Sequence, residues 1–258
     1  REHMEYARRL LETLPRELLD SASDPFGARA VIYGLLLDKN EEVQANQIAH
    51  LRSVADRPVF AATEKILPLM LTMNEEARLP LMDLSMPSLR SMSLEQFRKF
   101  EENVSSLVRI DERISIFEFI LEHVVVRRLE KNFITPQHTV KEIESIQEVA
   151  DDVSCVLTLL ANIGHAEDDA AQAFAGAAAT LDQSGATFRY HTKEECKRIR
   201  LGRVLNRLAQ LNPKVKQTLI TAFFQSLVHD KKITMKEAEF FRLLVYALET
   251  PLPPWIKI

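Results

Sequence analysis

The chain has 258 residues and a formal net charge of −4, with 46% hydrophobic and 27% charged residues. This composition is ordinary for a globular protein, and the slight negative balance provides no long-range attraction for nucleic acid or an anionic membrane surface. From this charge we expect no nucleic-acid partner. No run of 18 apolar residues occurs, so we also expect no membrane-spanning helix. Only 6 residues are glycine, which favours helices over a turn-rich strand fold.

Helix start signals recur at short intervals between residues 24 and 131. They are Asp24 with Pro25, Asn40, Pro58, Asn74, and Ser93 with Gln96. Each signal precedes a run of apolar residues at helical spacing, and the intervening loops are short. We therefore predict an all-α fold of stacked antiparallel helical hairpins.

Two polar stretches, 130–144 and 182–192, interrupt this pattern and are predicted to be connectors. Helices are expected between them and again from residue 192 onward. We place a first helical subdomain at 1–131 and a second at 132–258, with one continuous domain as the alternative.

One short pattern occurs twice, in "SLVRIDERISIFEF" (106–119) and "SLVHDKKITMKEAEFF" (226–241). A calcium loop would need an oxygen ligand at its third position, where Arg113 and Lys232 stand, and a pair of catalytic carboxylates is a second alternative. The spacing of Ser or Thr and a later Glu instead matches a capping box at the start of a helix. We therefore predict a duplicated helix–Asp turn–helix unit. Its structural turn and cap residues are Asp111, Ser115, Glu118, Asp230, Thr234 and Glu237.

The sequence provides no recognisable catalytic motif. None of its seven histidines are spaced i, i+4, so the His-Glu-x-x-His zinc helix is absent. A Gly-x-Ser-x-Gly elbow, a Walker loop and a dinucleotide fingerprint are absent as well. We predict that this chain is not an enzyme and contains no catalytic residue, no metal ligand and no cofactor. Partner-binding residues are not identified by any motif.

Three stretches carry a family resemblance: "LPRELLDSASDPFGARAVIYGLLLD" (14–38), "ARLPLMDLSMPSLRSMSLEQFRKFEENVSSLVRIDERISIFEF" (77–119) and "DKKITMKEAEFFRLLVYALETPLPP" (230–254). Together they resemble the C-terminal soluble region of membrane-bound M48 family zinc metallopeptidases of Gram-negative bacteria. The Asp-turn units also resemble the helical repeats of TerB-like domains, where a Gly often follows the Asp; here Glu112 and Lys231 follow it.

The resemblance implies a non-catalytic C-terminal module for protein interaction or regulation. Zinc would belong only to a catalytic domain that precedes this region in the family. The implied location is the cytoplasmic side of the bacterial inner membrane, and the implied partner is the protease domain itself, a client or a regulator. The alternative is a free-standing helical scaffold of the HEAT or TerB-like kind that binds a protein of its own.

Overall fold

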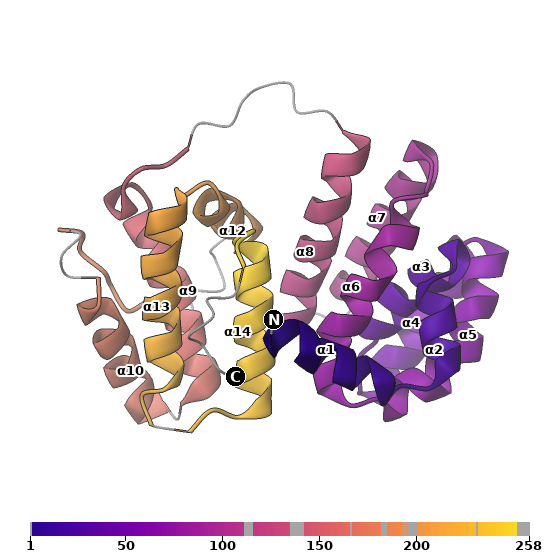
Figure 1. The fold of residues 1–258 in the computed structure, drawn as a ribbon, viewed down its shortest axis with the longest axis horizontal. Coiled ribbons are helices and arrows are strands. Elements are labelled where there is room, and N and C mark those ends of the chain that lie inside the picture. Colours follow the sequence, from indigo (N-terminus) through magenta and orange to yellow (C-terminus); the bar gives the residue numbers. More distant parts are fainter. Residues whose placement is uncertain are drawn as a thin grey trace. The chain divides into compact units, whose positions relative to one another are not determined.

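A computed structural model of the chain describes residues 2–110, 116–134, 142–165, 167–181, 185–192, 195, 201–230 and 232–251 (Figure 1). Within these residues the chain consists of helices and loops, apart from an isolated bridge between Ile143 and Leu211. The predicted all-α class is therefore confirmed. The chain divides into two compact units, Arg1–Pro136 (unit 1) and Gln137–Ile258 (unit 2).

Unit 1 runs from α1 to α8. Its described elements are α1 (Glu2–Glu12), α2 (Arg16–Ala22), α3 (Pro25–Leu36), α4 (Glu41–Val54), α5 (Arg57–Thr72), the 3-10 turn η1 (Glu75–Ala77), α6 (Arg78–Leu89), α7 (Leu94–Arg109) and α8 (Ile116–Phe133).

Helix α3 is the centre of unit 1. Asp24 caps its start, because its carboxylate accepts hydrogen bonds from the backbone N–H groups of Phe26 (2.9 Å) and Gly27 (2.8 Å). Most of its side chains are buried on every side, as expected for a helix without a polar face. It packs against α2, α5, α6, α7 and α8. The stacking of consecutive helices as hairpins stays a prediction, whereas the packing around α3 is what the structure describes.

The end of α2 and the start of α3 approach each other closely. A Cβ atom added at Gly27 would lie 2.4 Å from the carbonyl oxygen of Ser21, which is backbone and cannot turn away. Only glycine fits this position without a shift of one of the two helices.

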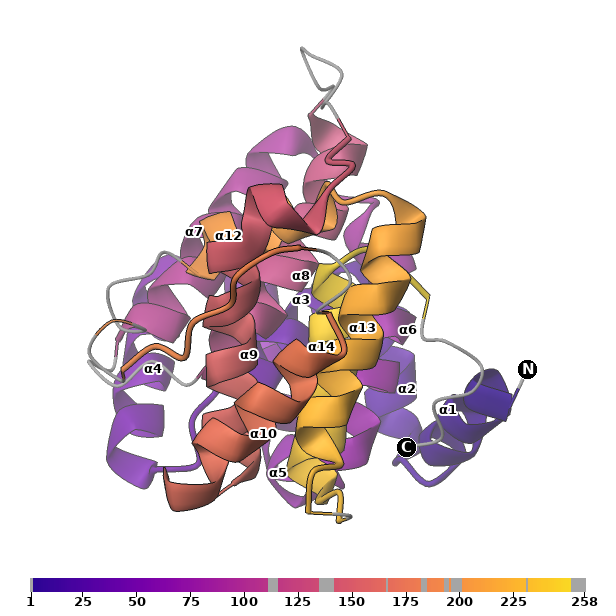
Figure 2. The same cartoon turned by 90° about the vertical axis from the view of Figure 1, so that its left-hand side faces the viewer.

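Unit 2 runs from the second 3-10 turn to α14. Its described elements are η2 (Ile146–Val149), α9 (Ala150–Gly164), α10 (Glu167–Ala179), α12 (Leu201–Ala209), α13 (Pro213–Leu227) and α14 (Met235–Ala247). Helix α9 packs against α10, α12 and α13, and α13 also packs against α14 (Figure 2). In α10, the small side chains of Ala170, Ala173 and Ala177 are fully buried and allow this close approach of helices.

The predicted subdomain boundary at 131/132 falls inside α8, which continues to Phe133. The aromatic ring of Phe133 stacks on that of Phe97 in α7, with ring centroids 4.7 Å apart. This contact holds the last turn of α8 against α7. The polar composition of 130–144 does not indicate it, because the partner ring lies 36 positions earlier in the chain. The predicted connector at 182–192 is loop, without helix or strand, where it is described, from 185 to 192.

Over the part of the chain that the structure describes, no helix combines the length and the apolar character that crossing a bilayer requires.

Candidate functional site

The predicted turn and cap residues are only partly covered by the structure. Asp111 and Ser115 lie outside the described residues, and Glu118 stands in the first turn of α8. Thr234 N-caps α14: its Oγ1 accepts a hydrogen bond from the N–H of Glu237 (3.3 Å), and the Glu237 carboxylate accepts one from the N–H of Thr234 (2.5 Å). Two side chains that bond to backbone groups in this way form a reciprocal capping box.

Asp230 closes the turn that precedes this cap. Its Oδ1 accepts a hydrogen bond from the backbone N–H of Lys232 at 2.9 Å. The Glu237 side chain is buried, at 2% exposure, and its second oxygen faces the Cα of Gly164 at the end of α9. The carboxylates of Asp230 and Glu237 are therefore bound to backbone groups of their own turn and cap, which gives them an architectural role.

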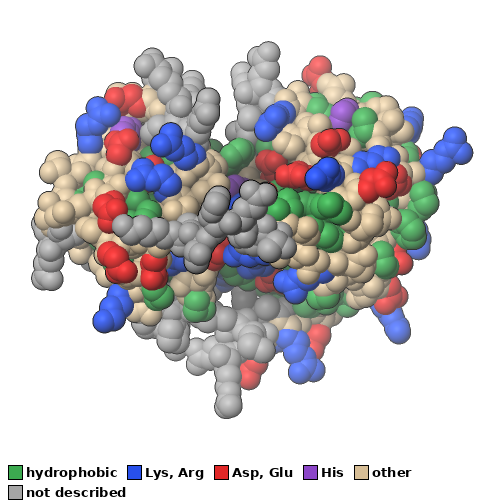
Figure 3. All heavy atoms as spheres, turned by 90° about the horizontal axis from the view of Figure 1, so that it is seen from above, with side chains coloured by type: hydrophobic (Ala, Val, Ile, Leu, Met, Phe, Trp, Pro, Cys, Tyr) green, Lys and Arg blue, Asp and Glu red, His purple; other side chains and the backbone are tan. Residues whose placement is uncertain are grey.

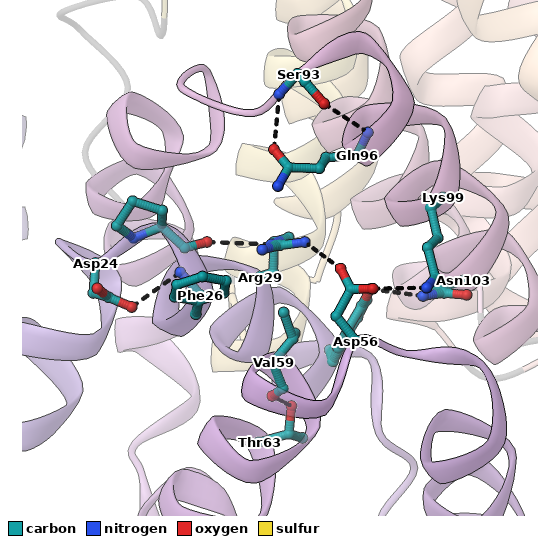
Figure 4. Close-up of polar contacts among 12 residues, drawn as sticks. Asp24, Phe26, Arg29, Asp56, Val59, Thr63, Ser93, Gln96, Lys99 and Asn103 are labelled. Carbon is teal, nitrogen blue, oxygen red and sulfur yellow. Dashed lines mark hydrogen bonds and ion pairs between the residues drawn. The ribbon is translucent and has the colours of Figure 1, made fainter.

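A polar network in unit 1 joins α3, α5 and α7 (Figure 4). Arg29 of α3 is buried, and its guanidinium bonds the carbonyl of Pro25 (3.2 Å) and the carboxylate of Asp56 (3.0 Å), the residue before α5. Lys99 of α7 donates to the other Asp56 oxygen at 2.7 Å. The hydrogen bond from Lys99, with the ion pair to Arg29, holds the pKa of Asp56 below its ordinary value against the effect of burial.

Deeper in the same unit, the amide of Asn103 donates to the hydroxyl of Tyr33 at 3.0 Å. Burial raises the pKa of the Tyr33 phenol to about 12. Because Arg29, Tyr33 and Asn103 are all buried, the network fixes the helices to one another and presents little surface to a substrate.

In unit 2 the extended segment 185–192 passes over α9 (Figure 2). The N–H of Arg189 donates to Ser154 Oγ (3.0 Å) and the N–H of His191 donates to Thr158 Oγ1 (3.1 Å). The hydroxyl of Tyr190 donates to Asn162 at 3.2 Å. Arg189 and His191 are two residues apart, and their acceptors Ser154 and Thr158 are four residues apart on the helix. Two residues of extended chain span about 6.6 Å and four residues of helix about 6 Å, so donors and acceptors have matching spacings.

We name the acceptors Ser154, Thr158 and Asn162 the polar ladder of α9. No motif indicates it, although its signal is present in the sequence: three polar side chains spaced i, i+4, i+8 in a helix that is otherwise apolar after Asp152. Ser154 and Thr158 satisfy backbone N–H groups of the segment, and Asn162 accepts from the side-chain hydroxyl of Tyr190. This role is structural.

The start of α9 carries a second polar group. Burial raises the pKa of the Asp152 carboxyl, although Arg207 Nη1 lies 2.6 Å from its Oδ2 and opposes the rise. The buried His191 places Nε2 3.6 Å from the exposed carboxylate of Asp151. Among the described residues, no three His, Cys, Asp or Glu side chains stand in positions that could hold a metal ion.

A depression on the surface of unit 1 lies between α6 and α8 and is here named the α6–α8 cavity. It has a volume of about 460 Å³, is open to solvent and is lined by Asp83, Met86, Pro87, Arg90, Arg128, Lys131 and Asn132. Met86 is almost fully buried, while Pro87, Arg90 and Lys131 are exposed, so the accessible lining consists of Pro87 among charged and polar side chains.

Local sequence explains part of the shape of the cavity. Pro87 has no N–H, so α6 lacks the helical hydrogen bond that residue 87 would otherwise donate to the carbonyl of residue 83. The Asn132 side chain donates to the carbonyl of Arg90 at 3.2 Å and ties the end of α8 to the end of α6. The two helix ends therefore form opposite sides of one depression.

Most charged side chains in the lining of the cavity are basic: Arg90, Arg128 and Lys131 stand with the single carboxylate of Asp83. Arg128 and Asp83 form an ion pair at 2.6 Å, which joins α8 to α6.

Hydrophobic side chains also remain on the surface of unit 1. Figure 3 shows them gathered between acidic and basic side chains on one face of this unit, the right-hand half of the view. Among its described residues, the large exposed hydrophobic side chains are Phe26, Leu71, Leu94 and Ile134. Leu94 follows Arg90, and Ile134 follows Asn132, by a few residues each.

No family model, no curated protein and no solved structure matches this chain. The resemblance to the membrane metallopeptidases and to TerB-like repeats stays a prediction from the three quoted stretches.

Proposed function

We propose that this chain is a non-catalytic module that recognises another protein through unit 1. The observation that carries the proposal is the α6–α8 cavity, whose volume of about 460 Å³ lies within the range of about 300–1,000 Å³ typical of pockets for small ligands. Its lining combines the exposed Pro87 with charged groups that can fix the orientation of a bound segment. Exposed hydrophobic side chains elsewhere on the same unit support recognition of a protein surface.

The family resemblance supplies the expected partner. If this chain is the C-terminal module of an M48-like zinc metallopeptidase, the cavity binds the protease domain, one of its clients or a regulator. Zinc and peptide cleavage then belong to the preceding domain, and binding takes place on the cytoplasmic side of the bacterial inner membrane. In the alternative, a free-standing helical scaffold uses the same cavity for a protein unrelated to a protease.

Site-specific photo-crosslinking tests the proposal. p-Benzoylphenylalanine is placed at position 131, on the cavity rim, and in a matched protein at position 98, an exposed basic position on α7. Both proteins are irradiated in cells that express the whole gene, and crosslinked proteins are identified by mass spectrometry. We expect a partner that crosslinks from position 131 and not from position 98.

Binding is then reconstituted with the purified partner. The double variant Arg90→Ala/Lys131→Ala should weaken it about tenfold or more, because rim charges control association and orientation. The double variant Arg98→Ala/Lys214→Ala removes the same charge from exposed positions outside the cavity and should bind like the wild type. A partner whose affinity is the same for both double variants would exclude the cavity as the recognition site.

A further inference from the structure

The ends of α9 and α13 lie side by side in unit 2, at its lower end in Figure 1, and bring together two histidines, His165 and His229. Their imidazole rings form an edge-to-face pair with ring centroids 5.7 Å apart. We infer that this histidine pair is a pH-responsive contact, which joins the two helix ends while at most one ring is protonated and releases them when both are. The inference concerns unit 2 and is independent of the function proposed for unit 1.

His165 is the member of the pair that bridges the two helices. It is the C-cap residue of α9, and its Nε2 lies 2.7 Å from the carbonyl oxygen of Ser226 in the last turn of α13. A carbonyl oxygen only accepts hydrogen bonds, so Nε2 carries a proton in the neutral ring. A charged His165 takes its second proton on Nδ1 and keeps the bond to Ser226. Protonation of this ring alone therefore leaves the contact closed.

His229 is the exposed member of the pair. It directly follows Val228, the C-cap residue of α13, so it exchanges protons with solvent. From α10, the residue that faces it is Gly176: a Cβ atom added there would lie 3.8 Å from His229 Nδ1. This part of α10 therefore brings no charged side chain to the ring.

Nearby negative groups compensate a single positive charge on the pair. On α14, the buried Glu237 turns Oε1 toward Gly164, the residue before His165. The other oxygen of Glu237 accepts from the N–H of Thr234, so this carboxylate is held in place. The C-terminus of each helix adds roughly half a negative charge next to the ring that follows it.

The remaining carboxylates of these elements are less able to compensate a second charge. Asp230 directly follows His229, and its Oδ1 already accepts from the N–H of Lys232. Asp169, in the first turn of α10, is exposed, so water and salt screen its charge. A second proton on the pair is therefore opposed by the first.

Repulsion between two charged rings gives the direction of the pH response. Two unit charges 5.7 Å apart shift an equilibrium about threefold in water-like surroundings and further near a protein surface. The closed contact then binds fewer protons than the open one, so it is favoured at high pH. It weakens as pH falls through the range of about 8 to 5, in which histidines gain charge.

Hydrogen exchange measured by NMR on the full chain at pH 8 and pH 5 tests the inference. The reporters are the backbone N–H groups of His165 and Val228, which bond to carbonyls in the last turns of α9 and α13. The N–H of Ala55, in the same position at the end of α4 in unit 1, is the internal control. Protection factors are corrected for the intrinsic effect of pH on exchange.

Three variants accompany the wild type. His229→Gln removes one ring from an exposed position. His165→Gln removes the other ring and retains an N–H donor for the Ser226 carbonyl. His123→Gln, on α8 of unit 1, is the matched control for loss of a histidine. Circular dichroism at pH 8 checks the folding of each variant, and His229→Gln decides the test if replacement of His165 disturbs the fold.

In the wild type, protection at residues 165 and 228 should fall about threefold or more between pH 8 and pH 5. Protection at Ala55 should stay constant, and high salt should reduce the fall because it screens the repulsion. His229→Gln and His165→Gln should each abolish the fall, since a single charge is compensated. His123→Gln should behave like the wild type.

A wild-type protein without this fall would overturn the inference, and so would an equal fall at Ala55. A fall that persists in His229→Gln would show that repulsion between the rings is not its cause. Loss of the fall in His123→Gln would assign it to histidine content in general. Imidazole nitrogen shifts that place the proton of neutral His165 on Nδ1 would contradict the bond to Ser226 on which the contact depends.

Discussion

Asp56 and Lys99 stand 43 positions apart in the chain, yet the Lys99 ammonium donates to Asp56 Oδ1 at 2.7 Å. The other oxygen of the same carboxylate takes the guanidinium of Arg29, whose side chain is only 4% exposed. One carboxylate therefore compensates a buried cation of α3 and an exposed cation of α7. Asp56, which precedes α5, therefore links α3, α5 and α7.

Asp56→Asn should lower the free energy of unfolding at pH 7 by about 1–3 kcal/mol. This is less than the roughly 3–5 kcal/mol of a fully buried pair, because the Asp56 side chain is 35% exposed. The folded pKa of Asp56 is depressed, so its contribution is present above the ordinary Asp pKa of about 3.9 and is lost as pH falls through the folded value. Urea unfolding from pH 7 to pH 2 should show the gap between variant and wild type closing below pH of about 4.

The control for this measurement is Asp20→Asn, which removes an exposed carboxylate 3.9 Å from Arg16. It should change stability by less than about 0.5 kcal/mol at any pH. Equal effects of Asp20→Asn and Asp56→Asn would mean that the network contributes nothing specific.

Tyr33 should resist ionisation. Its phenol pKa of about 12 lies above the ordinary value of about 10, so the folded state retains the proton longer than the unfolded state does. Stability from this difference is complete below pH of about 10 and is lost as pH rises toward 12. Absorbance titration should show a late tyrosine that Tyr33→Phe removes; a wild-type curve identical to that of the variant would contradict the burial of the hydroxyl.

Two glycine substitutions should change stability in opposite directions. In Gly27→Ala the new methyl group would lie 2.4 Å from the Ser21 carbonyl oxygen, so overpacking should cost about 1–3 kcal/mol. In Gly176→Ala the nearest atom, His229 Nδ1, is 3.8 Å away, and helix propensity should add about 0.5–1 kcal/mol. Thermal unfolding of both variants measures this. A neutral Gly27→Ala would show that α2 and α3 can separate there without cost.

Thr158→Val keeps the shape of the side chain and removes the acceptor for the N–H of His191. A buried donor without a partner costs about 1–3 kcal/mol. Hydrogen exchange at the His191 amide should also accelerate. Thr221→Val, which removes a hydroxyl bonded only to its own helix at an exposed site, should stay within about 0.5 kcal/mol of the wild type. Unchanged exchange at His191 would argue against the ladder.

Thr234→Ala should destabilise the chain by about 0.5–2 kcal/mol, because the N–H of Glu237 loses its acceptor. Thr234→Ser retains the oxygen and should recover most of the loss. Chemical denaturation of the three proteins makes the comparison, and equal losses for Ala and Ser would assign the effect to the methyl group of the threonine.

Helix starts were the most predictable part of this fold. Asp24, Asn40 and Ser93 cap helices at the positions that their sequence signals indicate. Each cap joins a side chain to backbone groups two or three residues away, so the whole interaction is contained in a short window of sequence. The predicted subdomain boundary at 131/132 is a different case. The stacking of Phe133 on Phe97, which lies beside it, joins residues too far apart for a short window of sequence to contain both.

The candidate site was not predictable in the same way. Asp83 and Arg128 are 45 positions apart, and nothing in the sequence around either residue indicates the other as its partner. The polar ladder is an intermediate case. Its spacing is visible in the sequence of α9, but the segment that donates to it is distant in the chain: Arg189 lies 35 positions after Ser154.

By itself, the sequence determined the helical class, the capped helix starts and the turn before α14, because these depend on propensity, periodicity and bonds between near neighbours. Only the tertiary structure decided that α3 is central, that Asp56 joins three helices, and that α6 and α8 line a cavity with mostly basic charged side chains. These features depend on which helix faces approach one another. That choice is set by the burial of apolar area over the whole unit, a sum to which every helix contributes and which no single stretch of sequence contains.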